Sequence, residues 1–254
     1  MSDFIYEKSP LVEVVLQLRF PAILVINTDL PSKFQDSIRD LFPLYNKIEE
    51  PTGYNSFSFN NYYYPNISNK IEFSANHSFV SEDGKDKINL TKDFIAFSTL
   101  NYEGWDNFKS KFFNVYKYFF EIYKPLFFTR VGLRYFNLFS RTELGITEEW
   151  KELIKPDFLG LYISNPEKDV ISNSVNSEIW LEPNEYKVNT KASFLLHNKE
   201  IVFVLDNDFF VFSSKINSDE SENKIDNLHK YAIDFFSKSI SDNMILSLKR
   251  KERK

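Results

Sequence analysis

Apolar and polar residues alternate along residues 11–20, LVEVVLQLRF. Every even position in this stretch is apolar, whereas Glu13, Gln17 and Arg19 interrupt the odd positions. Successive side chains of a strand point to opposite faces of the sheet. The pattern therefore predicts a β-strand with one face in the core and one partly polar face.

A second stretch, residues 127–139 (FFTRVGLRYFNLF), has a similar pattern. A shift of 115 residues places Leu18-Arg19-Phe20 on Leu133-Arg134-Tyr135, and both stretches carry arginine among β-branched and aromatic residues. Residues of these types favour strands. We therefore expect two related strands, each with its polar side chains on one face.

Two other stretches have apolar residues at three- and four-residue spacing, the period of an amphipathic helix. The first, 106–123, ends before Pro125, and the second, 221–240, has acidic residues near its start. Proline interrupts a helix, and the helix dipole favours acidic groups at the N-terminal end. Shorter helices are expected at 31–42 and 148–154.

Further strands are expected from the same reasoning, at 55–59, 71–79, 87–91, 94–100, 170–182, 186–197 and 201–212. Each half of the chain then reads strand, short helix, several strands and long helix. Strands joined by tight turns favour antiparallel pairing, and helices with one apolar stripe are expected to cover one side of a sheet. We predict an α+β fold in which a curved, mostly antiparallel sheet has helices on its convex face and an open concave face. The chain would form one domain of two pseudo-repeats, about 1–125 and 126–254.

This order of elements resembles the duplicated saddle of TATA-binding-protein-like and helix-grip folds. Several segments are also similar to a sporadically distributed, uncharacterised bacterial family of about 250 residues. They are SPLVEVVLQLRF, GWDNF at 104–108, RVGLRYFN at 130–137, LDNDFF at 205–210 and LHKYAIDFFSKSISD at 228–242. The resemblance spans most of the chain and transfers no catalytic residues. The patchy distribution of that family implies a context such as mobile or phage-defence genes.

Composition narrows the class of protein. The 254 residues are 43% hydrophobic and 26% charged, as in ordinary globular proteins, and no stretch approaches the ~20 apolar residues of a membrane span. The first ten residues lack the pattern of a signal peptide, and the absence of cysteine excludes disulfides and thiolate-bound metals. We expect a cytoplasmic protein with no membrane partner. The net charge of -5 argues against a broad, non-specific hold on nucleic acid, but it is compatible with a local basic surface.

The six glycines are isolated in the sequence. They form no phosphate-cradling loop and no serine-hydrolase elbow, so the usual signatures of nucleotide-binding proteins and serine hydrolases are missing. The sequence identifies no cofactor, no catalytic residue and no oligomeric state.

The arginines provide the leading hypothesis for a site. Arg130 and Arg134 should share a strand face, as should Arg19 with Glu13 and Gln17 in the earlier strand. Guanidinium groups bind phosphate or carboxylate, and Gly132 would let a ligand approach the backbone. We therefore expect a non-enzymatic module that binds an anionic small molecule or nucleic acid on the concave face. The alternative is that Glu13 and the arginines form an ion-pair network that satisfies a half-buried face.

Two further hypotheses use other residues. Asp206 and Asp208 share a strand face, and with His229 they could hold Mg²⁺ or Mn²⁺ in a nuclease or phosphohydrolase. A hydrogen-bonded core histidine beside a turn is the competing interpretation. The tyrosine-rich loop at 60–68 and the outer helices could instead contact protein partners in a scaffold subunit.

Overall fold

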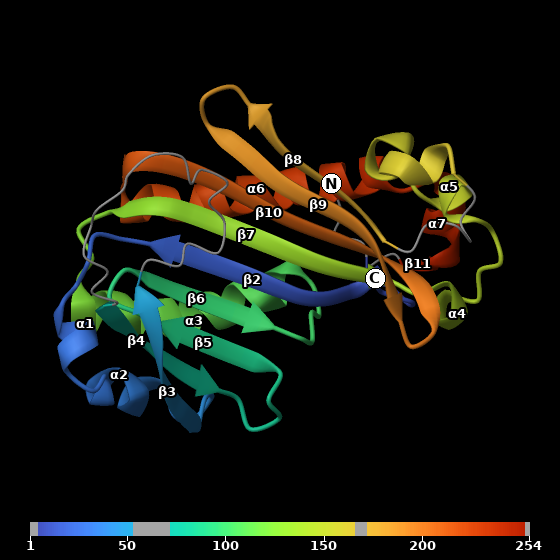
Figure 1. Ribbon diagram of the computed structural model, residues 1–254. Helices are drawn as coiled ribbons and strands as arrows, with labels where there is room; N and C mark the ends of the chain where they lie inside the picture. Colours follow the sequence, from blue (N-terminus) through green and yellow to red (C-terminus); the bar gives the residue numbers. More distant parts are fainter. Residues whose placement is uncertain (1–4, 53–71, 166–171, 252–254) are drawn as a thin grey trace.

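The computed structural model describes residues 5–52, 72–165 and 172–251 (Figure 1). Within them, the largest element is one nine-stranded sheet in which every neighbouring pair is antiparallel. From one edge to the other, its strands are β3 (Leu44–Thr52), β4 (Glu72–Val80), β5 (Asp86–Leu90), β6 (Phe94–Thr99), β2 (Leu11–Arg19), β7 (Phe128–Phe139), β10 (Glu200–Ile216), β9 (Tyr186–His197) and β8 (Asn173–Glu182). The predicted α+β class with an antiparallel sheet is confirmed.

The two strands expected from the alternating patterns, β2 and β7, are neighbours at the middle of this sheet (Figure 1). Their register pairs Leu16 with Leu133 and Gln17 with Gly132. Their apolar side chains therefore lie together on one face and their polar side chains on the other.

The two long helices, α3 (Trp105–Tyr123) and α6 (Ser218–Ser239), pack on the same face of the sheet, behind the strands as drawn in Figure 1. Shorter helices lie around the sheet: α1 (Val25–Thr28), α2 (Ser32–Ile38), α4 (Arg141–Leu144), α5 (Trp150–Leu153) and α7 (Asp242–Ser247), with 3₁₀ turns at Pro156–Phe158 and Gly160–Ile163. A two-stranded pair joins β1 (Ile5–Tyr6) to β11 (Arg250–Lys251).

The core explains which face of the sheet is covered. Val14, Leu16 and Leu18 of β2 are fully buried, and they belong to one apolar cluster with side chains of both long helices. Each such side chain contributes about 1.5–3 kcal/mol when it is removed from water. A second cluster around Trp150 and Phe203 lies beneath α5 and α7. The apolar faces of β2 and β7 thus meet the helices, as predicted, and the polar faces of these strands form what we call the open face.

Local signals position the two long helices. α3 ends at Tyr123, and the next residue, Lys124, caps it with left-handed φ and ψ immediately before Pro125. α6 begins with a capping box, in which Asn217 and Glu220 satisfy each other's backbone N–H groups. The stripe of α3 that packs on the sheet is the one expected from its spacing: Trp105, Phe108, Phe112, Val115 and Phe119.

Several boundaries differ from the predicted ones. The helix expected at 31–42 ends at Ile38, and the one at 148–154 shrinks to a single turn, α5. The two 3₁₀ turns, Pro156–Phe158 and Gly160–Ile163, were not predicted. Strand β3 was not predicted, because LYNKIEEPT lacks clean alternation and contains Pro51, which an edge strand tolerates. The strand expected at 55–59 and the loop at 60–68 lie outside the described residues.

No helix in the described part of the chain has both the length and the hydrophobicity that crossing a membrane requires.

Candidate functional site: the open face of the sheet

The open face carries all five residues that the sequence nominates as ligand-binding. Arg19, Gln17 and Glu13 come from β2, and Arg130 and Arg134 come from its neighbour β7. Arg19 lies directly opposite Arg130, and Glu13 lies opposite Phe136. The register therefore gathers these side chains at the centre of the sheet, as expected.

Arg130 is held on every side. Its Nη2 donates to both carboxylate oxygens of Asp208, at 2.8 and 2.7 Å, and its Nη1 donates to Oε1 of Gln17 at 3.2 Å. Its guanidinium carbon lies 4.8 Å from the centroid of the Phe210 ring, within the range of a cation–π contact. This side chain is fixed by its neighbours before any ligand arrives.

The absence of a side chain at Gly132 leaves room for the guanidinium of Arg130, not for a ligand. A Cβ atom at this position would lie 2.0 Å from Nη1 of Arg130, closer than any real contact. The guanidinium therefore occupies the space that a side chain at position 132 would fill. The expectation that Gly132 opens the backbone to a ligand is wrong, because Arg130 fills that space.

Arg134 forms a second ion pair, with Asp206. Nε and Nη2 each donate to a different carboxylate oxygen at 2.6 Å, the two-pronged geometry that suits guanidinium and carboxylate. The hydrogen bonds to Asp206 raise the pKa of Arg134 above its ordinary value, and the nearby charges of Asp208 and Glu13 add to that effect. The alternative of an ion-pair network is thus confirmed in part, but the carboxylates that pair with Arg130 and Arg134 belong to Asp208 and Asp206 and not to Glu13.

Arg19 differs from the other two arginines. Its Nε donates to Oε1 of Gln17 at 3.0 Å, the same oxygen that accepts from Arg130, and its side chain is exposed. Within the described residues it forms no ion pair with a carboxylate. Among the three arginines of the open face, Arg19 is therefore the one without a carboxylate partner in the described residues.

Basic side chains outnumber acidic ones in the part of the open face around Arg19. The sheet register defines four rows of side chains across the open face, through Arg19, Gln17, Val15 and Glu13. In the described strands these rows hold six basic side chains and four acidic ones: Arg19, Lys87, Arg130, Arg134, Lys187 and Lys191 against Glu13, Glu178, Asp206 and Asp208. This surplus of two positive charges stands out in a chain with a net charge of -5.

The proposed metal set of Asp206, Asp208 and His229 is not assembled. The two aspartates lie on the open face in ion pairs, whereas His229 is buried on the helix-covered face. There its ring stacks on Trp105 with 4.0 Å between centroids, and its Nδ1 lies 2.7 Å from Oη of Tyr135. Within the described residues, no group of three or more histidine or acidic side chains could hold a metal ion. The core-histidine interpretation of His229 is the correct one.

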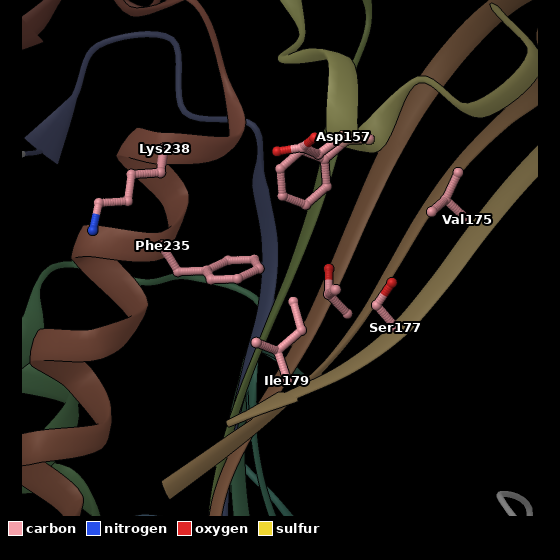
Figure 2. A pocket seen from close by; sticks show the side chains of 8 residues that line it. Asp157, Val175, Ser177, Ile179, Phe235 and Lys238 are labelled. Carbon is pink, nitrogen blue, oxygen red and sulfur yellow. The ribbon is translucent and has the colours of Figure 1, made fainter. Parts of the chain in front are cut away.

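A cavity of about 280 Å³ lies on the helix-covered face, between α6, the Pro156–Phe158 turn and strands β8 and β9. Figure 2 shows Phe235 on the helix pointing toward Ser177 and Ile179 on the strands, whereas the Lys238 side chain extends away from them. Two of its polar side chains already have partners, because Thr190 donates to Asn207 at 2.6 Å and Lys238 pairs with Asp234. The remaining polar side chains of the lining are Asp157 and Ser177, so the cavity offers few polar groups to orient a ligand.

No protein-family model and no curated protein matches this chain, so the geometry of the open face carries the functional argument.

Proposed function

We propose that the chain is a non-enzymatic binding module that takes an anionic ligand on the open face of its sheet. The observation that carries this proposal is Arg19, an exposed arginine without a carboxylate partner among the described residues, which shares Gln17 with Arg130. The charges of Arg130 and Arg134 are neutralised by aspartates. An anion is therefore attracted most strongly to Arg19, whose charge is not neutralised by a described carboxylate. The surplus of positive charge in the surrounding rows would draw the ligand to this end.

The ion pairs have a role in this proposal. They hold Arg130 and Arg134 in fixed geometry, so an anion that reaches the row meets donors that need little further ordering. Arg134 is still 39% exposed, which leaves part of its guanidinium accessible beside Asp206. The ligand therefore adds to the existing network and does not have to replace an aspartate.

The duplication of the two halves forms part of the same proposal. A shift of 115 residues relates Gln17 to Gly132, and these two residues pair with each other between β2 and β7. A two-fold relation between the halves requires such a self-matched pair at its axis. The resemblance to a patchily distributed bacterial family suggests phage defence as the cellular context.

Retention on immobilised heparin, a polyanion, tests the proposal. The protein should be retained at low salt, and Arg19→Ala should elute at a clearly lower salt concentration. Arg39→Ala is a matched control, because Arg39 is an exposed arginine of the α2 end, 66% accessible and paired with Asp36. Equal elution of both variants and the parent, or no retention of the parent, would contradict the proposal.

A further inference from the structure

The open face carries aromatic rings that the anion-binding proposal does not use. Phe210, Lys187 and Trp180 follow one another across β10, β9 and β8 in one row of the register. Phe212 lies one row further along, opposite Arg130. Two cations in this region contact rings: Arg130 lies over Phe210, and Nζ of Lys187, which also pairs with Glu178, lies 4.3 Å from the centroid of Trp180.

Two of these rings are exposed to solvent on a sheet face. Phe212 is 70% accessible and Trp180 is 51% accessible, although the described chain buries most of its other large rings in two core clusters. Contiguous exposed apolar surface marks interaction sites more often than single scattered apolar residues do. We call Phe210, Phe212 and Trp180, with Arg19, Arg130 and Lys187, the cation–aromatic strip.

We propose that the cation–aromatic strip binds single-stranded nucleic acid. This inference rests on the proposed function and names its ligand class. Aromatic side chains stack on bases of any sequence, and arginine and lysine beside them contact the phosphates. The surplus of positive charge in the four rows complements a polyanion. A partner protein with an apolar surface would not require that surplus.

The spacing of the rings favours a single strand over a duplex. Neighbouring strands lie roughly 4.8 Å apart, so the two exposed rings, Phe212 and Trp180, which are two strands and one row apart, are separated by more than roughly 10 Å. Rings at that distance can receive bases only if the bases are splayed apart. Bases in a duplex are stacked on each other and are not available to such rings.

Trp180 also reports on binding directly. The chain has three tryptophans, and Trp105 and Trp150 are buried while Trp180 is exposed. Stacking of a base on Trp180 should therefore quench the emission of the exposed indole. The quenching should disappear in Trp180→Phe, which keeps a ring for stacking.

The test is fluorescence anisotropy with labelled single-stranded DNA and RNA oligonucleotides and with a duplex of the same sequence, over a series of salt concentrations. Phe212→Ala and Trp180→Ala should each weaken single-strand binding by roughly 5- to 150-fold, the effect of losing one stacked base, without changing the salt dependence. Arg19→Ala should lower the slope of log affinity against log salt by about 0.7, the value for one phosphate contact. Leu246→Ala, at a 75% exposed apolar residue of α7, is the control and should bind normally.

Two results would overturn the inference. One is binding of the duplex as tight as that of the single strand. The other is oligonucleotide binding that neither aromatic variant changes. In both cases Arg19-dependent retention on heparin would leave the proposed function standing. If the parent protein neither binds the oligonucleotides nor is retained on heparin, both the inference and the proposed function are wrong.

Discussion

Arg134 reaches diagonally across the sheet to Asp206 and not to Asp208, the residue directly opposite it in the register. Arg130 lies opposite Phe212 and reaches past Phe210 to Asp208. Both arginines therefore lean in the same direction along β10, Arg134 by two residues and Arg130 by four. Diagonal neighbours on a sheet lie within reach of long side chains, and the shared lean leaves Phe212 without a charged group above it.

Removal of Arg134 should destabilise the protein. In Arg134→Ala the carboxylate of Asp206, which is only 16% exposed, would lose both of its charged hydrogen bonds. We expect a loss of about 1–2 kcal/mol in the free energy of unfolding, measured by urea denaturation. Asp206→Ala should cost a similar amount. The double variant should cost less than the sum of the two, by about 1 kcal/mol, because the unpaired charge is gone. Strictly additive losses would show that the pair contributes nothing to stability.

Substitution of Gly132 by alanine should act through Arg130. The new Cβ would occupy the position of the guanidinium, so Arg130 would have to leave Gln17 and Asp208. We expect Gly132→Ala to lower the free energy of unfolding by about 1–3 kcal/mol, as for a lost charged hydrogen-bond set. In an Arg130→Ala background the same change should be neutral or stabilising, since alanine fits a strand better than glycine. A loss that is unchanged in that background would mean that the backbone, and not Arg130, requires glycine.

Acidification should weaken the fold through His77. This side chain is buried, with Nδ1 3.0 Å from Oη of Tyr45 and Nε2 2.8 Å from the carbonyl oxygen of Ile26. Burial lowers the pKa of His77 below its ordinary value of 6.5, and the bond to Ile26 opposes this only partly. The unfolded chain then binds the proton more readily than the folded one. Stability is therefore retained above about pH 6.5 and falls as the pH drops from there towards the folded pKa, by about 1.4 kcal/mol for each unit between the two pKa values.

Urea denaturation at about pH 7 and about pH 5.5, a range chosen to bracket the ordinary histidine pKa, measures this effect. His77→Gln keeps a polar side chain but cannot take up a proton. The drop in stability between the two pH values should be smaller in this variant than in the parent. His197→Gln, at an exposed histidine of β9, is the control and should keep the full drop. An identical drop in the parent and in His77→Gln would assign the effect to other groups.

Much of the architecture follows from local pattern. The alternation in β2 and the spacing in α3 and α6 predict these elements closely, because each buries one face against a single partner layer. Short elements such as α1 and α4 carry too few residues for a periodic signal. Strand β3 escapes the same reasoning because it lies at the edge of the sheet formed by the described residues and its sequence is mixed.

The site was predictable in part. Face parity groups Arg130 with Arg134 on one strand and Arg19 with Gln17 on the other, and the adjacency of β2 and β7 brings the two groups together. Parity also places Asp206 and Asp208 on one face, but only the register against β7 reveals that this is the arginine face. His229 was associated with the aspartates because a helix stripe and a strand face cannot be assigned to the same side from sequence alone. The rings of Phe212 and Trp180 become informative only when their exposure is known.

The central position of β2 and β7 also governs how the chain can fold. β2 pairs with β6 inside the first half of the chain, but its other edge is completed only by β7, after α3 has been made. Closing a contact between such distant segments carries a large entropic cost, so joining the two halves is expected to be the slow step. Until then the backbone N–H and C=O groups along that edge of β2 are unpaired. Strand β7 of a second molecule can pair with this edge in place of β7 of the same molecule. The same seam that aligns the arginines is thus the place where two copies of the chain would exchange halves.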